Sequence, residues 1–154
     1  MNLVSKYSNG FDFSYLEDSN PIIQKTIKGK IINSVVDSTK KQELLEWKQK
    51  IAKTIHHERK GKIYSPNNHF TISLSFRFSP SLHGNAKLDV ENYMKPILDG
   101  IAAGLFCEIK QDPFQITKFD YDDSNFERLY IEKLKDCNPT DEGIMISILQ
   151  KMNF

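Results

Sequence analysis

The residues with the clearest chemical potential lie in the segment LDVENYMKPILDG, residues 88–100. Asp89 and Glu91 stand two residues apart, Lys95 follows four residues after Glu91, and Asp112 offers another carboxylate downstream. Converging carboxylates bind hard divalent cations, which can polarise a phosphate and lower the pKa of a bound water molecule. A nearby lysine can neutralise developing negative charge. The segment therefore predicts a metal-dependent site that cleaves phosphodiesters.

The same acids could instead stabilise a helix. Aspartate is a preferred N-cap residue, so Asp89 could begin a helix, and Glu91 in the first turn would complement the helix dipole. Asn92 could complete the cap, and such a cap contributes about 1 kcal/mol without any function. In favour of a site, Glu91 and Lys95 are four residues apart and project from one helical face.

A proline inside this helix has a local consequence. Pro96 has no amide hydrogen, so the carbonyl of Asn92 loses its helical partner. We expect the helix to begin late or to bend around Lys95. Asp99 lies one turn after Lys95 and is expected to pair with it.

Carboxylates without cysteine or histidine partners favour Mg²⁺ or Mn²⁺ over zinc. A second acidic group, Asp120, Asp122 and Asp123, offers a rival cation site. We interpret it as an acidic turn in solvent, with Phe119 and Tyr121 directed into the core.

The bulk composition is that of one domain. The chain has 154 residues and a net charge of +1, with lysine and arginine concentrated in residues 25–62 and acids denser after residue 89. A basic first half suits a phosphate-binding surface, although a solvated lysine-rich helix is the alternative. Cys107 and Cys137 form no CxxC pair, so reduced thiols are expected. No stretch is apolar enough to cross a bilayer and the start lacks a signal-peptide core, so we expect a cytoplasmic protein with no membrane association.

The elements that must position these residues follow from periodicity. We expect an α+β (mixed α/β) single domain in the order β-α-β-α-β-β, with two main helices packed on a small mixed sheet. Residues 69–78 alternate apolar and polar side chains, which predicts a half-buried strand. The other expected elements are an irregular arm (1–20), one or two strand segments (22–36), helices (39–60 and 90–104), two strands joined by a turn (115–123 and 128–134) and a last strand (143–152).

The pattern D-x-E-N-x-x-K-P-x-L-D-G, followed by D-P-F-Q-I, resembles the RusA family of Holliday junction resolvases. That family shows Asp-x-Asp-Asn-x-x-Lys, then an Asp-Asp pair and Gln-Val or Gln-Ile, and the similarity covers roughly residues 21–121, within an expected RusA-like nuclease domain of residues 21–154. The resemblance implies that Asp89, Glu91 and Asp112 are metal ligands, that Lys95 is the catalytic lysine and that Asn92 has an orienting role.

Two residues depart from the family pattern. Glu91 replaces the second aspartate of the motif, which keeps the charge and lengthens the side chain by one methylene. The downstream acid pair is reduced to Asp112, followed by Pro113. Alignment without a gap places Asp112 at the first acid of the pair, and a shift of one residue places it at the second.

The resemblance implies a Mg²⁺-dependent endodeoxyribonuclease, with Mn²⁺ as a possible substitute, that resolves branched DNA by paired nicks. It also implies a homodimer, because a four-way junction has near two-fold symmetry and two opposed strands must be cut. The reduced acid pair leaves an alternative, a weakly active or non-catalytic protein that binds branched DNA on the same fold. The residues expected to grip DNA phosphates are Lys48, Lys53, Arg59, Lys60, Lys62 and Lys87.

Overall fold

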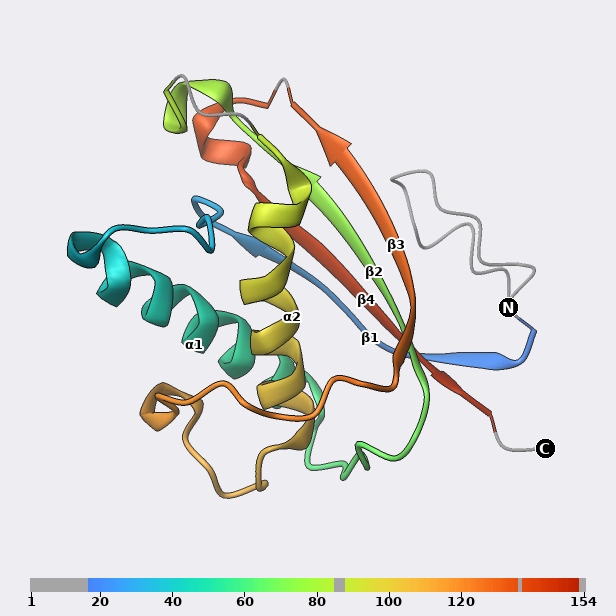
Figure 1. The fold of residues 1–154 in the computed structure, drawn as a ribbon. Helices are drawn as coiled ribbons and strands as arrows, with labels where there is room; N and C mark the ends of the chain where they lie inside the picture. The colour runs from blue at the N-terminus through green and yellow to red at the C-terminus, as the bar shows by residue number, and fades with distance from the viewer. Residues whose placement is uncertain (1–16, 85–87, 136, 153–154) are drawn as a thin grey trace.

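The computed structural model of the chain describes residues 17–84, 88–135 and 137–152. It confirms a single α+β domain with the element order β-α-β-α-β-β (Figure 1). The strands and helices are β1 (Ser19–Lys28), α1 (Lys41–Glu58), β2 (Phe70–Arg77), α2 (Val90–Phe106), β3 (Phe126–Leu134) and β4 (Gly143–Lys151). Short 3-10 turns also occur: η2 (Ser38–Lys40), η3 (Pro80–Leu82), η4 (Pro113–Gln115) and η5 (Pro139–Asp141).

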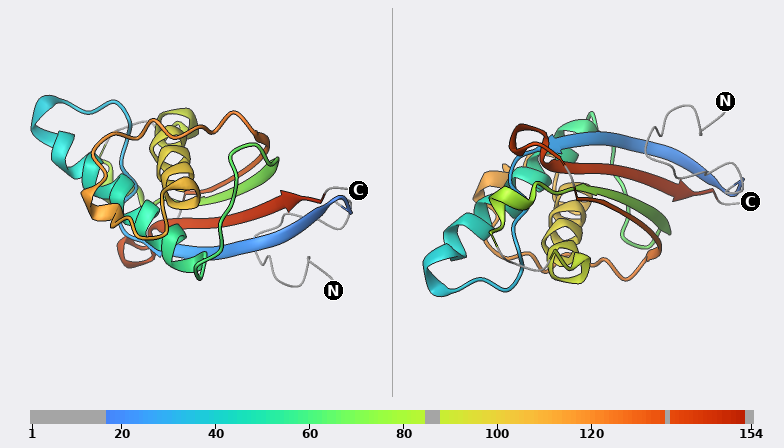
Figure 2. Two further views of the ribbon diagram at one scale, coloured as in Figure 1. Left: turned by 90° about the horizontal axis from the view of Figure 1, so that it is seen from below. Right: turned by 90° about the horizontal axis from the view of Figure 1, so that it is seen from above.

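The four strands form one mixed sheet in the order β1-β4-β2-β3. β4 runs antiparallel to both β1 and β2, whereas β2 and β3 are parallel. Parallel neighbours need a crossover connection, and α2 lies within the one that joins β2 to β3. Both helices cover the same face of the sheet, as the two views in Figure 2 show. The predicted packing of two helices on a small mixed sheet is confirmed.

Apolar residues at period two build the sheet side of the core. Ile144, Ile146 and Ile148 of β4 are fully buried, and they lie beside Ile72 and Leu74 of β2. The helices contribute apolar residues at helical spacing to the same cluster. Those of α1 are Trp47, Ile51 and Ile55, and those of α2 are Tyr93, Ile97, Ile101 and Leu105.

Strand β2 is more deeply buried than its alternating pattern predicted. Ser73 and Ser75, on the face that points away from the helices, are 4% and 2% exposed. β2 lies between β3 and β4, and the longer side chains of Tyr130 and Glu132 stand opposite these two serines in register. The half-buried prediction is therefore wrong for an internal strand with short polar side chains.

The predicted strand over residues 115–123 is absent. This segment runs irregularly past α2 before β3 begins at Phe126 (Figure 1). Phe119 and Tyr121 pack against a small cluster that contains Ala52 of α1 and Ala103 of α2. Their alternation therefore reflects contact with the two helices rather than pairing in the sheet.

The predicted N-terminal arm lies largely outside the described residues, and β1 begins at Ser19, so it includes the last two residues of that arm. Within the described part of the chain, no helix combines the length and hydropathy needed to span a bilayer.

Candidate functional site

The start of α2 has the cap geometry that the sequence predicted. Asp89 is the N-cap residue in an extended conformation, and its Oδ1 accepts a hydrogen bond from the backbone N–H of Glu91 at 3.3 Å. The Nζ of Lys133 in β3 donates to the carbonyl of Leu88 at 2.9 Å, which ties this end of the helix to the sheet. Asp89 and Glu91 are both exposed, so the cap leaves two carboxylates in contact with solvent.

The carbonyl that Pro96 releases finds a partner in another segment. The backbone N–H of Ser34 donates to the carbonyl of Asn92 at 2.7 Å. This bond replaces the helical one that a proline cannot supply. α2 consequently runs without interruption from Val90 to Phe106. The released carbonyl is confirmed, but the expected late start is not observed.

Lys95 stands on the solvent side of α2, one turn beyond Glu91, with 74% of its side chain exposed. Its Nζ lies 3.4 Å from Oδ1 of Asp99, which confirms the expected pair. The other oxygen of Asp99 lies 3.5 Å from Nζ of Lys48 on α1. Asp99 thus bridges two lysines and leaves the Lys95 ammonium largely in solvent.

Asp112 is placed away from this turn, on the segment that follows α2. Its Oδ1 accepts a hydrogen bond from the N–H of Phe114 at 3.0 Å and caps η4. The side-chain amide of Gln49 on α1 donates to the carbonyls of Phe114 and Ile116, at 3.0 and 2.8 Å. η4 is therefore fastened to α1 rather than to the start of α2.

The structure does not gather the three expected ligands. Among the described residues, no group of three or more histidine, cysteine, aspartate or glutamate side chains is placed to hold a metal ion. Asp89 and Glu91 share the first turn of α2, and Asp112 is not grouped with them. Mg²⁺ is usually bound by one or two protein carboxylates and completes its shell with water and substrate phosphate. The exposed pair fits such an open site, and the three-carboxylate set does not.

The second acidic group, Asp120, Asp122 and Asp123, lies in an exposed turn. Oδ1 of Asp122 accepts a hydrogen bond from the N–H of Ser124 at 2.9 Å. Hydrogen bonding from Ser124 lowers the pKa of the Asp122 carboxyl. Asp120 and Asp123 are exposed beside it. Phe119 and Tyr121 are partly buried, as the sequence predicted.

One expected DNA contact is contradicted by burial. Arg59 is 2% exposed, and its Nη1 donates to the carbonyls of Gly104 and Cys107 at 3.1 and 2.8 Å. Its Nε donates to the carbonyl of Lys62 at 2.9 Å. The two Nη1 bonds satisfy carbonyls at the C-terminal end of α2, which have no helical partner. Arg59 therefore stabilises the fold and is not presented to a phosphate.

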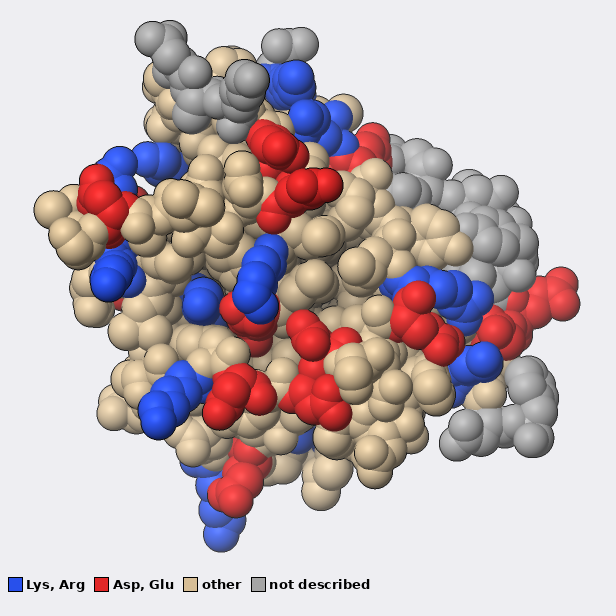
Figure 3. All heavy atoms as spheres, in the orientation of Figure 1, with Lys and Arg blue, Asp and Glu red and all other residues tan. Residues whose placement is uncertain are grey.

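The remaining expected phosphate contacts differ in exposure. Lys48 is held between Asp99 and the ring of Phe119, whose centroid lies 5.4 Å from the Lys48 ammonium. Lys53, Lys60 and Lys62 are exposed, and Lys87 lies outside the described residues. In Figure 3, acidic side chains run along the middle of the face formed by α2 and the segment in front of it, with basic side chains between and around them. This face therefore carries both signs of charge rather than a continuous basic surface.

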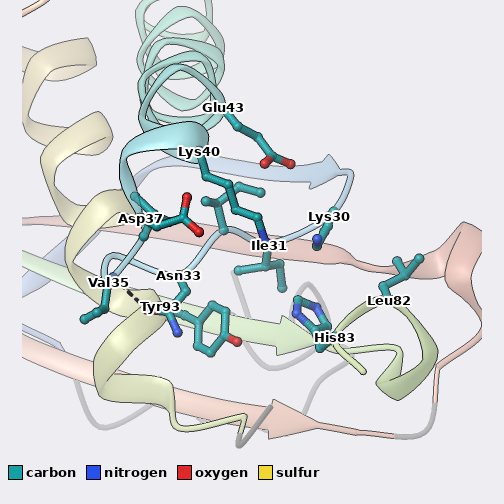
Figure 4. Close-up of a pocket in the computed structure, with 12 residues that line it drawn as sticks. Lys30, Ile31, Asn33, Val35, Asp37, Lys40, Glu43, Leu82, His83 and Tyr93 are labelled. Atoms are coloured by element: carbon teal, nitrogen blue, oxygen red, sulfur yellow. Dashed lines mark hydrogen bonds between the residues drawn. The ribbon is translucent and has the colours of Figure 1, made fainter. Parts of the chain in front are cut away.

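A buried acid–histidine pair was not expected from the sequence. The carboxylate of Glu142 lies 2.7 Å from Nε2 of His83, and the two side chains are 0% and 5% exposed. His83 and Tyr93 line a cavity of about 350 Å³ between the segment after β1 and the start of α2 (Figure 4). His83 and Glu142 are 59 residues apart, so no local pattern signals the pair.

No protein-family model, no curated protein sequence and no solved structure matches this chain.

Proposed function

We propose that the protein is a Mg²⁺-dependent endonuclease of RusA type that cuts branched DNA as a homodimer. The observation that carries the proposal is the joint exposure of Asp89, Glu91 and Lys95 on the first two turns of α2. Two carboxylates and a lysine on one accessible helix end supply the groups that metal-assisted phosphodiester cleavage needs.

Each residue has a distinct role in this proposal. Asp89 and Glu91 would bind the cation through carboxylate oxygens, while the backbone N–H of Glu91 orients the Asp89 carboxylate. Mg²⁺, when bound, would polarise the scissile phosphate and favour ionisation of a water molecule. Lys95 would place its ammonium near the phosphate as negative charge develops. Asp99 keeps Lys95 close to the helix through the 3.4 Å ion pair.

Substrate contacts would come from exposed cations outside the site. Lys53, Lys60 and Lys62 lie on α1 and the turn that follows it, where they can meet DNA phosphates. Binding through phosphates releases counterions, so the affinity should fall steeply as salt rises. We also propose a cytoplasmic location, which agrees with the free thiols of Cys107 and Cys137.

A labelled four-way junction incubated with the protein and Mg²⁺ tests the proposal. The wild type should produce paired nicks in opposed strands. Asp89→Asn is the informative variant, because asparagine caps a helix as well as aspartate does but loses the charge. Asp89→Asn and Lys95→Ala should each slow cutting by at least about 100-fold while junction binding persists.

Glu108→Gln provides a matched control, because Glu108 is an exposed acid just beyond the opposite end of α2. It should cut at the wild-type rate. A wild-type protein that binds the junction with Mg²⁺ present and leaves every strand intact would sink the enzymatic proposal.

A second candidate is a protein that binds branched DNA without cutting it. The placement of Asp112 on η4, away from the Asp89–Glu91 pair, favours this alternative over an enzyme with three metal ligands. Calorimetric titration with Mn²⁺ separates the two candidates. Heat that is abolished by Asp89→Asn supports the enzyme, and salt-dependent junction binding without any metal heat supports the binder.

A further inference from the structure

Glu142 is a charged residue that the proposed chemistry does not use, and it is 1% exposed. It immediately precedes β4 and contacts His83, which lines the cavity shown in Figure 4. Burial of a carboxylate costs several kcal/mol unless hydrogen bonds and a counter-charge offset it. Hydrogen bonds from two backbone amides and a contact with His83 offset this cost.

The carboxylate of Glu142, just before β4, contacts two other parts of the chain. Oε2 accepts a hydrogen bond from the backbone N–H of Ile31 at 2.8 Å, and Oε1 accepts one from the N–H of Ser79 at 2.7 Å. Nε2 of His83 lies 2.7 and 3.0 Å from the two oxygens. The backbone carbonyl of Glu142 also accepts a bond from the N–H of Gly29 at 2.9 Å. One residue therefore fixes the segment after β1 to the turn after β2.

The segment after β1 continues to the first turn of α2. Three residues beyond Ile31, the N–H of Ser34 donates to the carbonyl of Asn92 at 2.7 Å. The side chains of Asn33, in that segment, and Tyr93, in the first turn of α2, are also hydrogen-bonded. The first turn of α2 is thus hydrogen-bonded to the segment after β1, which Glu142 holds in place.

The turn after β2 reaches the same helical turn through aromatic packing. The rings of His83 and Tyr93 meet edge to face with centroids 5.7 Å apart. Phe78 contacts both rings, at 5.5 Å from His83 and 5.0 Å from Tyr93. Figure 4 shows His83, Tyr93 and Asn33 converging on the cavity wall. Two routes therefore link Glu142 to the turn that carries Asp89 and Glu91.

We infer that Glu142 is a positioning residue, which fixes the first turn of α2 so that Asp89 and Glu91 present their carboxylates together to one cation. The inference rests on the proposed function, since the cation is the one proposed above. Residues that orient metal ligands from behind typically change metal affinity by about 10- to 100-fold when they are replaced.

Glu142→Gln tests this role, because glutamine keeps the shape and loses the charge. Oε1 and Oε2 of Glu142 each accept a backbone N–H, and glutamine puts an amide nitrogen, which cannot accept, in place of one of them. At least one of the bonds from Ile31 and Ser79 must therefore break. The affinity for Mn²⁺, measured by calorimetry without DNA, should fall by at least about tenfold. Hydrogen exchange at the Ser34 amide should accelerate.

A purely structural role predicts a different result, and Ile148→Val distinguishes it. Ile148 is fully buried on β4, the strand that follows Glu142, and the loss of one methyl lowers stability by about 0.5–1.5 kcal/mol. Both variants are assayed at a temperature where circular dichroism shows them folded. Ile148→Val should keep the wild-type Mn²⁺ affinity and Ser34 exchange rate. Equal metal affinity in wild type and Glu142→Gln would overturn the inference.

Three further outcomes remain decisive. If Glu142→Gln does not fold, Glu142→Asp replaces it, because its side chain is one methylene shorter and cannot keep the bonds to both Ile31 and Ser79, and an unchanged Mn²⁺ affinity would again overturn the inference. If the wild type binds Mn²⁺ but cuts no junction, the proposed function fails while the affinity comparison still decides the role of Glu142. If the wild type binds no Mn²⁺, both proposals fail.

Discussion

The N-terminal half of α2 exposes Asp89, Glu91 and Lys95 to solvent, whereas the C-terminal half packs tightly against α1. A Cβ added at Gly100 would lie 2.8 Å from Cβ of Ile51, so no side chain fits there. The first half buries Tyr93 and Ile97 in the core but keeps a capped face in solvent, whereas the second half is buried almost throughout. The difference indicates that rigid packing at one end of a helix leaves the other end available for chemistry.

The largest expected loss of stability comes from removing the Arg59 guanidinium, which bonds the packed end of α2. Arg59→Met keeps an apolar stem but leaves the buried carbonyls of Gly104 and Cys107 without donors. Each unsatisfied buried acceptor costs about 1–3 kcal/mol. We expect urea unfolding to show a loss of about 3 kcal/mol in the free energy of unfolding.

The neighbouring Lys60 is an exposed cation and serves as the control for Arg59. Lys60→Met should change stability by no more than about 0.5 kcal/mol. Similar losses for the two variants would show that Arg59 contributes only general charge.

The next largest effect is expected from adding a methyl group at Gly104, where α1 and α2 are in close contact. A Cβ at Gly104 would lie 2.7 Å from the backbone carbonyl oxygen of Ala52 and 2.7 Å from Cβ of Ile55. Gly104→Ala should therefore force the helices apart and lower the free energy of unfolding by about 2 kcal/mol. Lys95→Ala on the exposed half should stay within about 0.5 kcal/mol. A more stable Gly104→Ala, as helix propensity alone predicts, would contradict the close packing.

A smaller loss of stability is expected from removing the N-cap at the exposed end of α2. Asp89→Ala removes the N-cap acceptor and should lower the free energy of unfolding by about 1 kcal/mol. Asp89→Asn should leave stability nearly unchanged, because asparagine caps equally well. Calorimetric melting of both variants checks the difference. A stable Asp89→Ala would mean that the 3.3 Å bond to the Glu91 amide contributes nothing.

The smallest effect depends on pH. Burial raises the pKa of the Cys107 thiol at the packed end, although Arg59 opposes the rise. In the unfolded chain the thiol ionises near its ordinary pKa of about 8.5, so above that pH the unfolded state binds fewer protons than the folded state. The free energy of unfolding should therefore be unaffected by Cys107 below about pH 8 and should fall as pH rises above it.

Urea unfolding of wild type and Cys107→Ala across this range measures the contribution. The variant should show a shallower decline between about pH 8 and pH 10. Burial also raises the pKa of Tyr93 in the exposed half, but tyrosine ionises near pH 10 in an unfolded chain, so its contribution begins higher. Identical slopes for the two proteins would contradict burial of the thiol.

Local patterns predicted most of the fold. Both helices and the strands at residues 69–78 and 143–152 occur where periodicity placed them, because each buries one face against a continuous core. The prediction of a strand at residues 115–123 was wrong because Phe119 and Tyr121 pack against the helices. Alternation of apolar and polar residues does not by itself show whether a neighbouring strand exists.

The candidate site was predictable only where its residues are close in sequence. Asp89, Glu91 and Lys95 occupy one helix end, and backbone geometry fixes their spacing. Asp112 could not be placed, because its position depends on how Gln49 holds η4 to α1. The mistaken DNA-binding role of Arg59 has the same origin, since only tertiary contacts bury its guanidinium.

By itself, the sequence determined the two helices, the capped and charged start of α2 and the carbonyl that Pro96 releases, because these depend on residues within a turn or two. Only the tertiary structure decided that Ser34 satisfies that carbonyl, that Arg59 is buried and that Glu142 reaches Ile31, 111 residues away. Such contacts depend on how distant segments meet over a shared core, and no local pattern encodes that meeting.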